Sequence, residues 1–352
     1  MKNKLKESLT LFFDKVKKKF KSNRLSSKNS YISLDVGSAY VKAVSLEKSN
    51  QDVFITGFSC EKIEADVKEA IKKALSNLSI KKKELIVSIS GQNIVLRYVN
   101  IPLMNKEEAD KAMSFELERY IPFNREDVNY DFVILKTNKN TGKMLVLIAA
   151  AKKDVVDNKI TLCRELGYQL DSVDVCPLAI ANYLEFANNV KDKVYAVVNL
   201  GASVSSVDII EDGLLVLSRD IFIGGNDFTK KISEVTNKSI KEAEYIKLKS
   251  LTDNLLQSLE PIFNNLAKEL KISFDFYETQ ENRMVDKILI TGGSIYMTGM
   301  LDIMKHYLGQ SIEFIEFNTD KFKITSSLDA TKFKDNFSFF TFALGMAVRN
   351  LK

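Results

Sequence analysis

Three polar side chains and a glycine at one tight turn have the types and spacing to hold the phosphates of a nucleotide. In residues 31–46 (YISLDVGSAYVKAVSL), Asp35 ends an apolar β-forming run, and Gly37 and Ser38 follow it. Lys42 lies on the next β-forming run. A hairpin tip of this kind turns backbone N–H groups towards an anion. Lysine adds positive charge for phosphate, and aspartate can hold Mg2+ through its water ligands. Many ordinary hairpins also carry D-x-G-S, so this turn alone does not establish a site.

A second turn of the same layout occurs in the second half of the chain. Residues 196–210 (AVVNLGASVSSVDII) again read as strand, turn and strand, with Gly201, Ala202 and Ser203 in the turn. Internal similarity of this kind predicts two related halves. We expect each half to contribute one phosphate-binding turn to a shared site.

A third apolar run ends in paired glycines. Residues 288–294 (ILITGGS) place Gly292, Gly293 and Ser294 directly after a predicted strand. Glycines at such a position let the backbone approach a flat ligand closely. Together, the three elements resemble the two phosphate loops and the adenosine loop of the actin-like ATPase superfamily, which includes actin, sugar kinases and bacterial FtsA.

The middle of the chain narrows the resemblance to the PilM family of type IV pilus assembly proteins. The residues that carry it are Ile101-Pro102, residues 115–123 (FELERYIPF) and residues 147–152 (LIAAAK). The run 115–123 is also explained locally, as a helix end followed by a turn that proline stops. The resemblance covers residues 31–349 with the order of elements intact. It implies an α/β, actin-like (ribonuclease H-like) fold of two lobes with an inserted FtsA/PilM-type αβ subdomain.

The resemblance also predicts how the chain divides. The expected parts are a basic N-terminal helix and linker (1–30), a first lobe (31–84, 171–190 and 337–352), the inserted unit (85–170) and a second lobe (191–336) with a helical subdomain at about 226–285. Residues 318–336 are polar and read as a surface loop. The run Lys81-Lys82-Lys83 reads as a solvated turn.

ATP and Mg2+ are the ligands that the resemblance implies. It adds Gly224 and Gly225, which precede a helix whose N-terminus faces the cleft. It also adds Glu244 and Lys247, which match the family's A-E-x-x-K motif, whose side chains contact ribose and base. Residues three apart share a helix face, although an ordinary surface ion pair explains the spacing equally well.

Three positions depart from the family pattern. Asn199 stands where the family usually has aspartate, Cys176 where FtsA-like proteins often have glutamate, and Pro177 where actin has its water-orienting glutamine. Asp35 and Asn199 are the expected Mg2+ positions, both acting through water. Loss of a water-activating group costs on the order of 10²–10⁴ in rate. We therefore predict ATP binding with slow or absent hydrolysis, and we assign no catalytic residue.

Motifs, cysteine spacing and charge argue against several other classes of protein. No G-x-x-x-x-G-K-[ST], G-x-G-x-x-G, H-E-x-x-H or G-x-S-x-G motif occurs. The three cysteines have no C-x-x-C spacing, which suits a reducing cytoplasm. Residues 1–28 hold ten Lys/Arg against two acidic residues, more than the whole net charge of +5. The remainder is therefore slightly acidic, and we expect no binding to nucleic acid.

The first 21 residues have the pattern of an interfacial helix. Apolar residues recur on one helical face, and lysines occupy the other: Leu5, Leu9, Phe12, Phe13, Val16 and Phe20 form the apolar face. Such a segment suits an anionic membrane surface, where each basic residue contributes about 1 kcal/mol. Docking on a protein, or no folded structure, are the alternatives. The membrane alternative predicts a cytoplasmic protein held peripherally at the inner face of the cell membrane.

The function that the resemblance implies is that of an adaptor. It grips the N-terminal tail of an inner-membrane, PilN-like protein in a groove between the first core subdomain and the inserted unit, and links it to the cytoplasmic motor side. Peptide capture of this kind uses backbone pairing and side-chain pockets. The alternative is an FtsA-like filament former in cell division; FtsA carries its membrane helix at the other end of the chain. Self-association stays open, and Asn199 and Cys176 disfavour an active ATPase or kinase.

Overall fold

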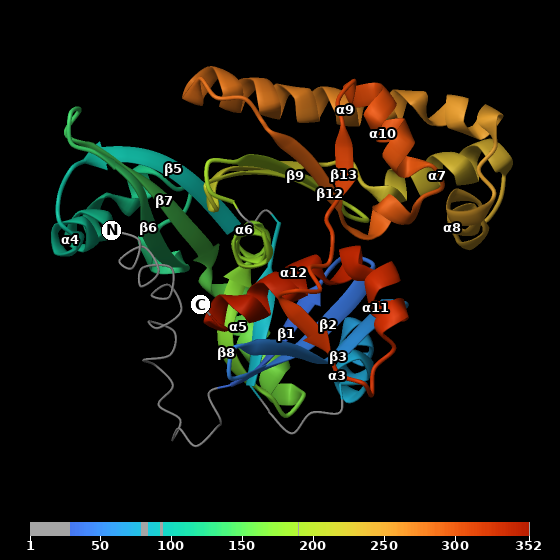
Figure 1. The fold of residues 1–352 in the computed structure, drawn as a ribbon, viewed down its shortest axis with the longest axis horizontal. Coiled ribbons are helices and arrows are strands. Elements are labelled where there is room, and N and C mark those ends of the chain that lie inside the picture. Colours follow the sequence, from blue (N-terminus) through green and yellow to red (C-terminus); the bar gives the residue numbers. More distant parts are fainter. Residues whose placement is uncertain (1–28, 79–83, 92–93, 189, 352) are drawn as a thin grey trace.

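Three β-sheets organise the part of the chain that the structure, a computed structural model, describes: residues 29–78, 84–91, 94–188 and 190–351 (Figure 1). The predicted N-terminal helix and the turn Lys81-Lys82-Lys83 lie outside these residues. Among the described residues, none of the helices is both long enough and apolar enough to cross a lipid bilayer.

The first lobe is built on a six-stranded sheet with the order β14-β3-β2-β1-β4-β8. Its strands are β1 (Ser30–Val36), β2 (Tyr40–Ser49), β3 (Asp52–Lys62), β4 (Glu84–Ile89), β8 (Gln169–Val175) and β14 (Phe322–Ile324). β1, β2 and β3 are antiparallel, whereas β4 and β8 add in parallel beside β1. The helices α3 (Val67–Ser76) and α5 (Lys153–Glu165) contribute apolar side chains to the core under this sheet.

The second lobe repeats this plan. Its five-stranded sheet has the order β11-β10-β9-β12-β13. The strands are β9 (Val194–Leu200), β10 (Ser205–Glu211), β11 (Leu214–Ile221), β12 (Lys287–Thr291) and β13 (Ile312–Phe314). β9, β10 and β11 are antiparallel, and β12 and β13 add in parallel beside β9. The prediction of two related halves from the repeated turn is confirmed at the level of strand order.

The outer layer of the second lobe is helical. Its helices are α7 (Gly225–Thr236), α8 (Ile240–Lys249), α9 (Asp253–Glu281) and α10 (Met300–Leu308), joined to β12 by the short η3 (Gly293–Tyr296). The apolar stripe of α9 packs into the core of this lobe through Leu259, Phe263, Leu266, Leu270 and Phe274. Figure 1 shows α9 lying along the outer edge of the molecule, away from the first lobe.

Two apolar helices lie between the lobes (Figure 1). They are α6 (Cys176–Ala187) and α12 (Phe337–Val348), followed by η4 (Arg349–Leu351). Their buried side chains form one core cluster with strands of both large sheets. A helix that is apolar on all sides is stable only when it is buried on all sides. The helices approach closely because Gly345 lies against the backbone of Ala179, where any Cβ would collide.

The inserted unit has a sheet and a core of its own. Strands β5 (Ile94–Pro102), β7 (Lys143–Lys152) and β6 (Val128–Asn138) form an antiparallel sheet in that order. The helix α4 (Lys106–Glu116) and the short turns η1 (Leu117–Arg119) and η2 (Arg125–Asp127) cover it. A capping box between Asn105 and Glu108 starts α4. Met113 and Leu117 pack onto this sheet.

Two sequence expectations differ from the structure. Strand β4, placed in the inserted unit by the expected boundary at residue 85, pairs with β1 and β8 in the first sheet. Residues 318–336 were expected to form a surface loop, but they contain β14 and the helix α11 (Ala330–Asp335). Phe322 and Phe333 anchor this segment in the first-lobe core. Two phenylalanines among many polar residues leave no periodicity to read, which is why the sequence pattern indicated a loop.

A buried carboxyl group lies on the second sheet. Asp208 of β10 accepts hydrogen bonds from Ser218 Oγ at 2.6 Å and from Ser206 Oγ at 3.3 Å. Burial, helped by the nearby Asp220 carboxylate, raises the pKa of Asp208 from 3.8 to about 7, although hydrogen bonds from the two hydroxyl groups oppose the shift. No cation is paired with Asp208 among the ion pairs of the described residues.

We expect the Asp208→Asn variant to lose a pH dependence of stability. Because the pKa is raised on folding, the contribution of Asp208 is fully present below pH 3.8 and is lost as the pH rises through about 7. At about 1.4 kcal/mol per pKa unit, the variant should be on the order of 2–4 kcal/mol more stable than the wild type at pH 8. Urea unfolding between pH 4 and pH 8 measures this difference. Asp302→Asn, at an exposed position, is the control, and equal pH profiles for all three proteins would contradict the prediction.

Candidate functional site

The first predicted turn is a hairpin between β1 and β2. The Gly37 N–H donates to the carbonyl of Tyr40 at 3.0 Å, and Asp35 is the cross-strand partner of Lys42. Lys42 Nζ lies 2.6 Å from Asp35 Oδ2, and both side chains are largely buried. Burial lowers the pKa of Lys42, but the charge of Asp35 and its hydrogen bond outweigh that effect, so the pKa is raised. Lys42 therefore carries its positive charge at neutral pH.

A serine that the sequence reading missed completes this group. Ser88 Oγ on β4 donates to Asp35 Oδ1 at 2.8 Å, so each carboxylate oxygen has one partner and keeps a lone pair for water. Ser88 stands beside Asp35 only because β1 and β4 pair in parallel, with Leu34 opposite Val87. No local signal in the sequence marks it.

Cys176 lies beside the same carboxylate. Burial raises the pKa of its thiol well above the ordinary value, and the charge of Asp35 raises it further. The thiol is therefore protonated at neutral pH and cannot act as a general base. Pro177 follows it in the first turn of α6. Ser38 is exposed at the tip of the hairpin, so the structure brings Asp35, Lys42 and Cys176 together while Ser38 faces solvent.

Lys159 is a second cation near this group, also missed in the sequence. Burial lowers its pKa, and the carboxylate of Asp35 is the charge that opposes the shift most. Lys159 lies on α5 between Val156 and Cys163, which are both buried. A lysine three and four residues from buried apolar positions on one helix face is the signal that could have identified it.

The predicted residues of the second lobe form one hydrogen-bonded cluster. The carbonyl of Gly201 accepts from the Gly225 N–H at 2.9 Å and from Ser294 Oγ at 2.7 Å. The Asn226 N–H donates to the carbonyl of Ala202 at 2.7 Å. The turn at 201–203, the start of α7 and the loop after β12 are thereby held together.

Close backbone approach makes glycine necessary at several of these positions. A Cβ on Gly224 would lie 2.5 Å from the carbonyl oxygen of Ala202, and one on Gly225 would collide with Ser294 Oγ. Ser203 Oγ accepts a hydrogen bond from Asn226 Nδ2 at 3.1 Å at the mouth of the same turn. The peptide N–H groups of these glycine turns are the groups that could face an anion.

Gly292 and Gly293 are constrained for different reasons. Gly292 has a φ of +100°, and a Cβ there would lie 2.5 Å from Asn199 Oδ1 and would also collide with the backbone of Leu200. A Cβ on Gly293 would lie 2.8 Å from the ring of Phe339. The loop after β12 is therefore pressed against the end of β9, which carries Asn199.

Lys247 is a buried ammonium group and not part of an ordinary surface ion pair. Its side chain is 4 % exposed and lies 2.7 Å from Glu244 Oε2. Its Nζ donates to the carbonyl of Gly225 at 3.0 Å and to Thr229 Oγ1 at 2.8 Å. Burial lowers the pKa of Lys247, and Glu244 opposes the shift. Thr229, which also donates to Glu244, was not predicted.

Three aromatic rings connect the groups of the two lobes. The ring of Phe339, at the start of α12, lies 5.2 Å from Tyr40 and 5.0 Å from Tyr296. Burial raises the pKa of Tyr40, and the charges of Cys60 and Glu244 raise it further. Tyr40 follows the first-lobe turn, whereas Glu244 and Tyr296 belong to the second lobe. The two groups of predicted residues are therefore neighbours across the start of α12.

The described residues hold no cluster of three or more His, Cys, Asp or Glu side chains able to bind a metal ion directly. A magnesium ion held through water needs fewer protein ligands, because Mg2+ keeps several of its waters and binds substrate phosphates. Asp35, with one free lone pair on each oxygen, fits that role better than Asn199, whose amide oxygen lies against Gly292.

The inserted unit carries a hollow of about 480 Å³. Its lining comes from α4, η1, η2 and the first residue of α5: Ser114, Phe115, Leu117, Glu118, Arg125, Glu126 and Lys153. The Phe115 side chain is 85 % exposed.

Comparisons with known proteins agree on the fold. A sequence model of the family described as "Type IV pilus assembly protein PilM" matches residues 33–351. A solved "PilM-PilN type IV pilus biogenesis complex" is similar with a TM-score of 0.81 and 23 % identity, covering 92 % of this chain and 98 % of that one. The ethanolamine utilization protein EutJ from Carboxydothermus hydrogenoformans is similar with a TM-score of 0.53 and 14 % identity, covering 98 % of each chain.

A curated relative matches a smaller part. The cell division protein FtsA of Bacillus subtilis (strain 168) is 21 % identical over an alignment of 251 residues, and the match covers 62 % of this chain. The match spans 57 % of the length of that protein. The predicted fold, an actin-like α/β architecture, is confirmed by these similarities.

The Gly292→Ala variant should be strongly destabilised. It combines a positive φ with collisions against the end of β9, and we expect a loss of about 3–5 kcal/mol in the free energy of unfolding. Gly142→Ala is the matched control, because its φ is +64° but its surroundings are open; about 1–2 kcal/mol is expected there. Urea unfolding compares the two, and equal losses would refute the close approach of the loop to β9.

Proposed function

Because the chain belongs to the PilM family of type IV pilus assembly proteins, we propose that it is an ATP-binding adaptor of type IV pilus, or related secretion, assembly. In this role it binds the N-terminal tail of an inner-membrane, PilN-like protein and links that protein to the cytoplasmic motor side. The observation that carries the proposal is the family match, which runs from residue 33 to residue 351 and so includes both lobes and the inserted unit. The solved PilM-PilN complex supports the same partner.

The two groups of residues at the start of α12 suit the phosphates and the nucleoside of ATP. Lys42 and the α6 N-terminus offer positive charge in the first lobe. The glycine turns at 201–203 and 224–225 offer peptide N–H groups in the second lobe. Glu244, whose side chain is 35 % exposed, offers an acceptor for the ribose, and Lys247, whose Nζ contacts Gly225, Thr229 and Glu244, fixes its position. Asp35 would hold Mg2+ through water, and the ion would neutralise phosphate charge when bound.

Hydrolysis is slow or absent in this proposal. The Cys176 thiol is protonated and Pro177 has no side-chain hydrogen-bonding group, so neither can deprotonate or orient a water molecule. Asn199, where the family usually has a carboxylate, is a neutral amide. ATP then acts as a ligand that joins the lobes and stabilises the folded chain by mass action.

The Lys42→Met variant tests the nucleotide site. Loss of a charged hydrogen-bond donor costs about 1.5–3 kcal/mol, so ATP affinity should fall by roughly 10- to 150-fold. Isothermal titration calorimetry with Mg-ATP measures it. Lys287→Met, which removes an exposed ion pair with Glu313, should bind ATP as the wild type does.

The proposed ATP site is contradicted if the wild-type protein binds no ATP, or if the Lys42→Met variant and the wild type bind ATP equally. The same preparations give the hydrolysis rate. ATP hydrolysis at about one turnover per second, which is within the ordinary range of enzymes, would contradict the proposal that hydrolysis is slow or absent.

We assign the partner peptide to the hollow on the inserted unit. Lys153 belongs to this hollow and is also the first residue of α5, which packs against β8 of the first lobe. The hollow therefore lies where the inserted unit joins the first lobe. Phe115 would supply the apolar contact, and Glu118, Glu126, Arg125 and Lys153 would pair with charges of the peptide.

The Phe115→Ala variant tests this assignment. Truncation of an aromatic anchor at an interface costs about 2 kcal/mol or more, so affinity for a peptide with the sequence of the PilN-like tail should fall at least about 30-fold. Fluorescence anisotropy with a labelled peptide measures it. Phe222→Ala, which removes an exposed phenylalanine from the second lobe, should leave the affinity unchanged. Equal affinity for both variants would move the peptide site elsewhere.

Peripheral attachment to the inner face of the membrane through residues 1–21 remains part of the proposal. These residues lie outside the described part of the chain. The FtsA-like filament former stays the alternative, supported by a match to 57 % of the length of that protein.

A further inference from the structure

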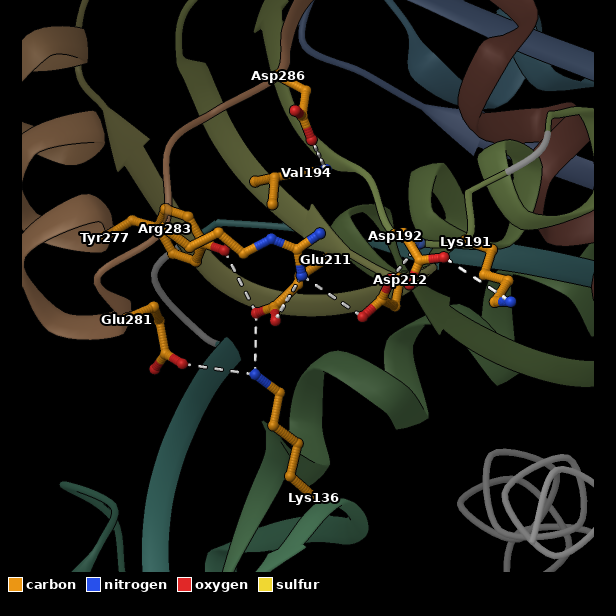
Figure 2. A network of polar contacts seen from close by, with 10 residues as sticks. All are labelled: Lys136, Lys191, Asp192, Val194, Glu211, Asp212, Tyr277, Glu281, Arg283 and Asp286. Atoms are coloured by element: carbon orange, nitrogen blue, oxygen red, sulfur yellow. Dashed lines mark hydrogen bonds and ion pairs between the residues drawn. The ribbon is translucent and has the colours of Figure 1, made fainter.

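A network of ion pairs joins the inserted unit to the second lobe (Figure 2). Lys136, on β6 of the inserted unit, places its Nζ 2.9 Å from Glu211 Oε2 and 3.4 Å from Glu281 Oε2. Glu211 is the last residue of β10, and Glu281 is the last residue of α9. Burial lowers the pKa of Lys136, but Glu211 and Glu281 outweigh it and raise the pKa. The lysine is therefore charged in this contact.

Glu211 keeps partners within its own lobe. Arg283 Nη1 lies 3.1 Å from Glu211 Oε1, and the Tyr277 hydroxyl donates to Glu211 Oε2 at 3.3 Å. Figure 2 shows Arg283 and Tyr277 approaching Glu211 from one side and Lys136 from another. The Lys136 side chain is 39 % exposed, so water can replace its partners. Separation of the two units would therefore leave no charge buried without a partner, and the contact is reversible in principle.

Irregular strand pairing places both sides of this contact. On β6 the register shifts between Ile134 and Lys136, so Leu135 is an extra residue in the strand. A second shift lies in the β10–β11 pairing between Ile209 and Ile210, where Val216 is the extra residue on β11. A β-bulge turns side chains away from their regular direction. Leu135 packs in the same core cluster as residues of the second sheet.

The hydroxyl group of Tyr98 disfavours close packing of the inserted unit against the second lobe. Tyr98 lies on β5, which contacts β11, and its hydroxyl is buried without a hydrogen-bond partner among the described residues. The charge of Asp208 on β10 acts on this hydroxyl. The groups around Asp208 are the hydroxyls of Ser206 and Ser218 and the carboxylate of Asp220, none of which is bonded to Tyr98. A buried unpaired hydroxyl favours a state in which water reaches it.

Strand β10 connects this contact with the nucleotide-binding turn. It begins at Ser205, two residues after the turn at 201–203, and ends at Glu211. The strand is buried along its whole length between β9 and β11, so one buried strand joins the turn to Glu211. On the other side of the contact, β6 belongs to the three-stranded sheet of the inserted unit, and the same unit carries the hollow.

We propose that the contact of Lys136 with Glu211, together with the packing of Tyr98, is a two-state latch through which ATP bound between the lobes regulates the grip of the inserted unit on its peptide partner. This inference rests on the proposed function and specifies how that function is controlled. The two ligands must then change each other's affinity by the same factor, because coupling between binding sites is reciprocal.

The test uses two variants with opposite expected effects. Lys136→Gln removes the attraction and should favour the open state, whereas Tyr98→Phe removes the unpaired hydroxyl, keeps the ring, and should favour the closed state. Lys323→Gln is the control, because its ion pair with Asp52 joins two strands of one sheet. Peptide affinity is measured with and without Mg-ATP, and ATP affinity with and without peptide.

For the wild type we expect each ligand to change the affinity of the other at least fivefold. In Lys136→Gln the factor should fall below about twofold, with both ligands still bound, while Lys323→Gln should match the wild type. Equal coupling in Lys136→Gln and wild type would overturn the proposal. So would the absence of coupling in wild-type protein that binds both ligands.

A distance measurement tests the latch independently of whether the chain binds ATP or the peptide. Spin labels at the exposed positions Asn140 and Thr279 report the separation of the inserted unit from the second lobe, without ATP or peptide. Pulsed electron paramagnetic resonance should show longer distances in Lys136→Gln and a narrower, shorter distribution in Tyr98→Phe. Identical distributions in both variants and wild type would overturn the latch whether or not ATP and peptide bind.

Discussion

The burial of two apolar helices between two sheets is the constraint on which the rest of the structure depends. α12 is buried along nearly its whole length and α6 over most of its surface, and each of the large sheets covers only part of the two helices. The lobes must therefore pack on the helices from both sides. That packing sets the ends of β1 and β9 near the start of α12, where Phe339 contacts both lobes. The neighbouring positions of the two glycine turns follow from the core and not from contacts between the turns.

At the first turn, the charges of Asp35 and Lys42 balance each other. Asp35 is satisfied by Lys42 and Ser88, and the nearest thiol is held in its protonated form by burial. The Cys176 thiol therefore does not accept a proton from water at neutral pH.

Much of the fold and many of the site positions were predictable from the sequence, because glycine turns and strand patterns are local signals. The repeated turns, the paired glycines after β12 and the A-E-x-x-K helix all lie where the pattern placed them. Ser88 and Thr229 were not predictable, because their positions depend on strand register and helix packing. The segment 318–336 was misread for a related reason: two buried phenylalanines hold it, and they have no periodicity.

The first lobe is assembled from three distant parts of the chain, and this affects the order in which the protein folds during its synthesis. Its core uses residues 30–78 and 84–89, then 169–187, and finally β14 and α12, whereas the second-lobe sheet uses only residues 194–314. Domains fold as units while the ribosome is still translating. The second-lobe sheet can thus assemble on the nascent chain while the earlier-made strands of the first lobe still lack α12. During that interval their apolar face is open to chaperones, and the order of maturation runs opposite to the order of translation.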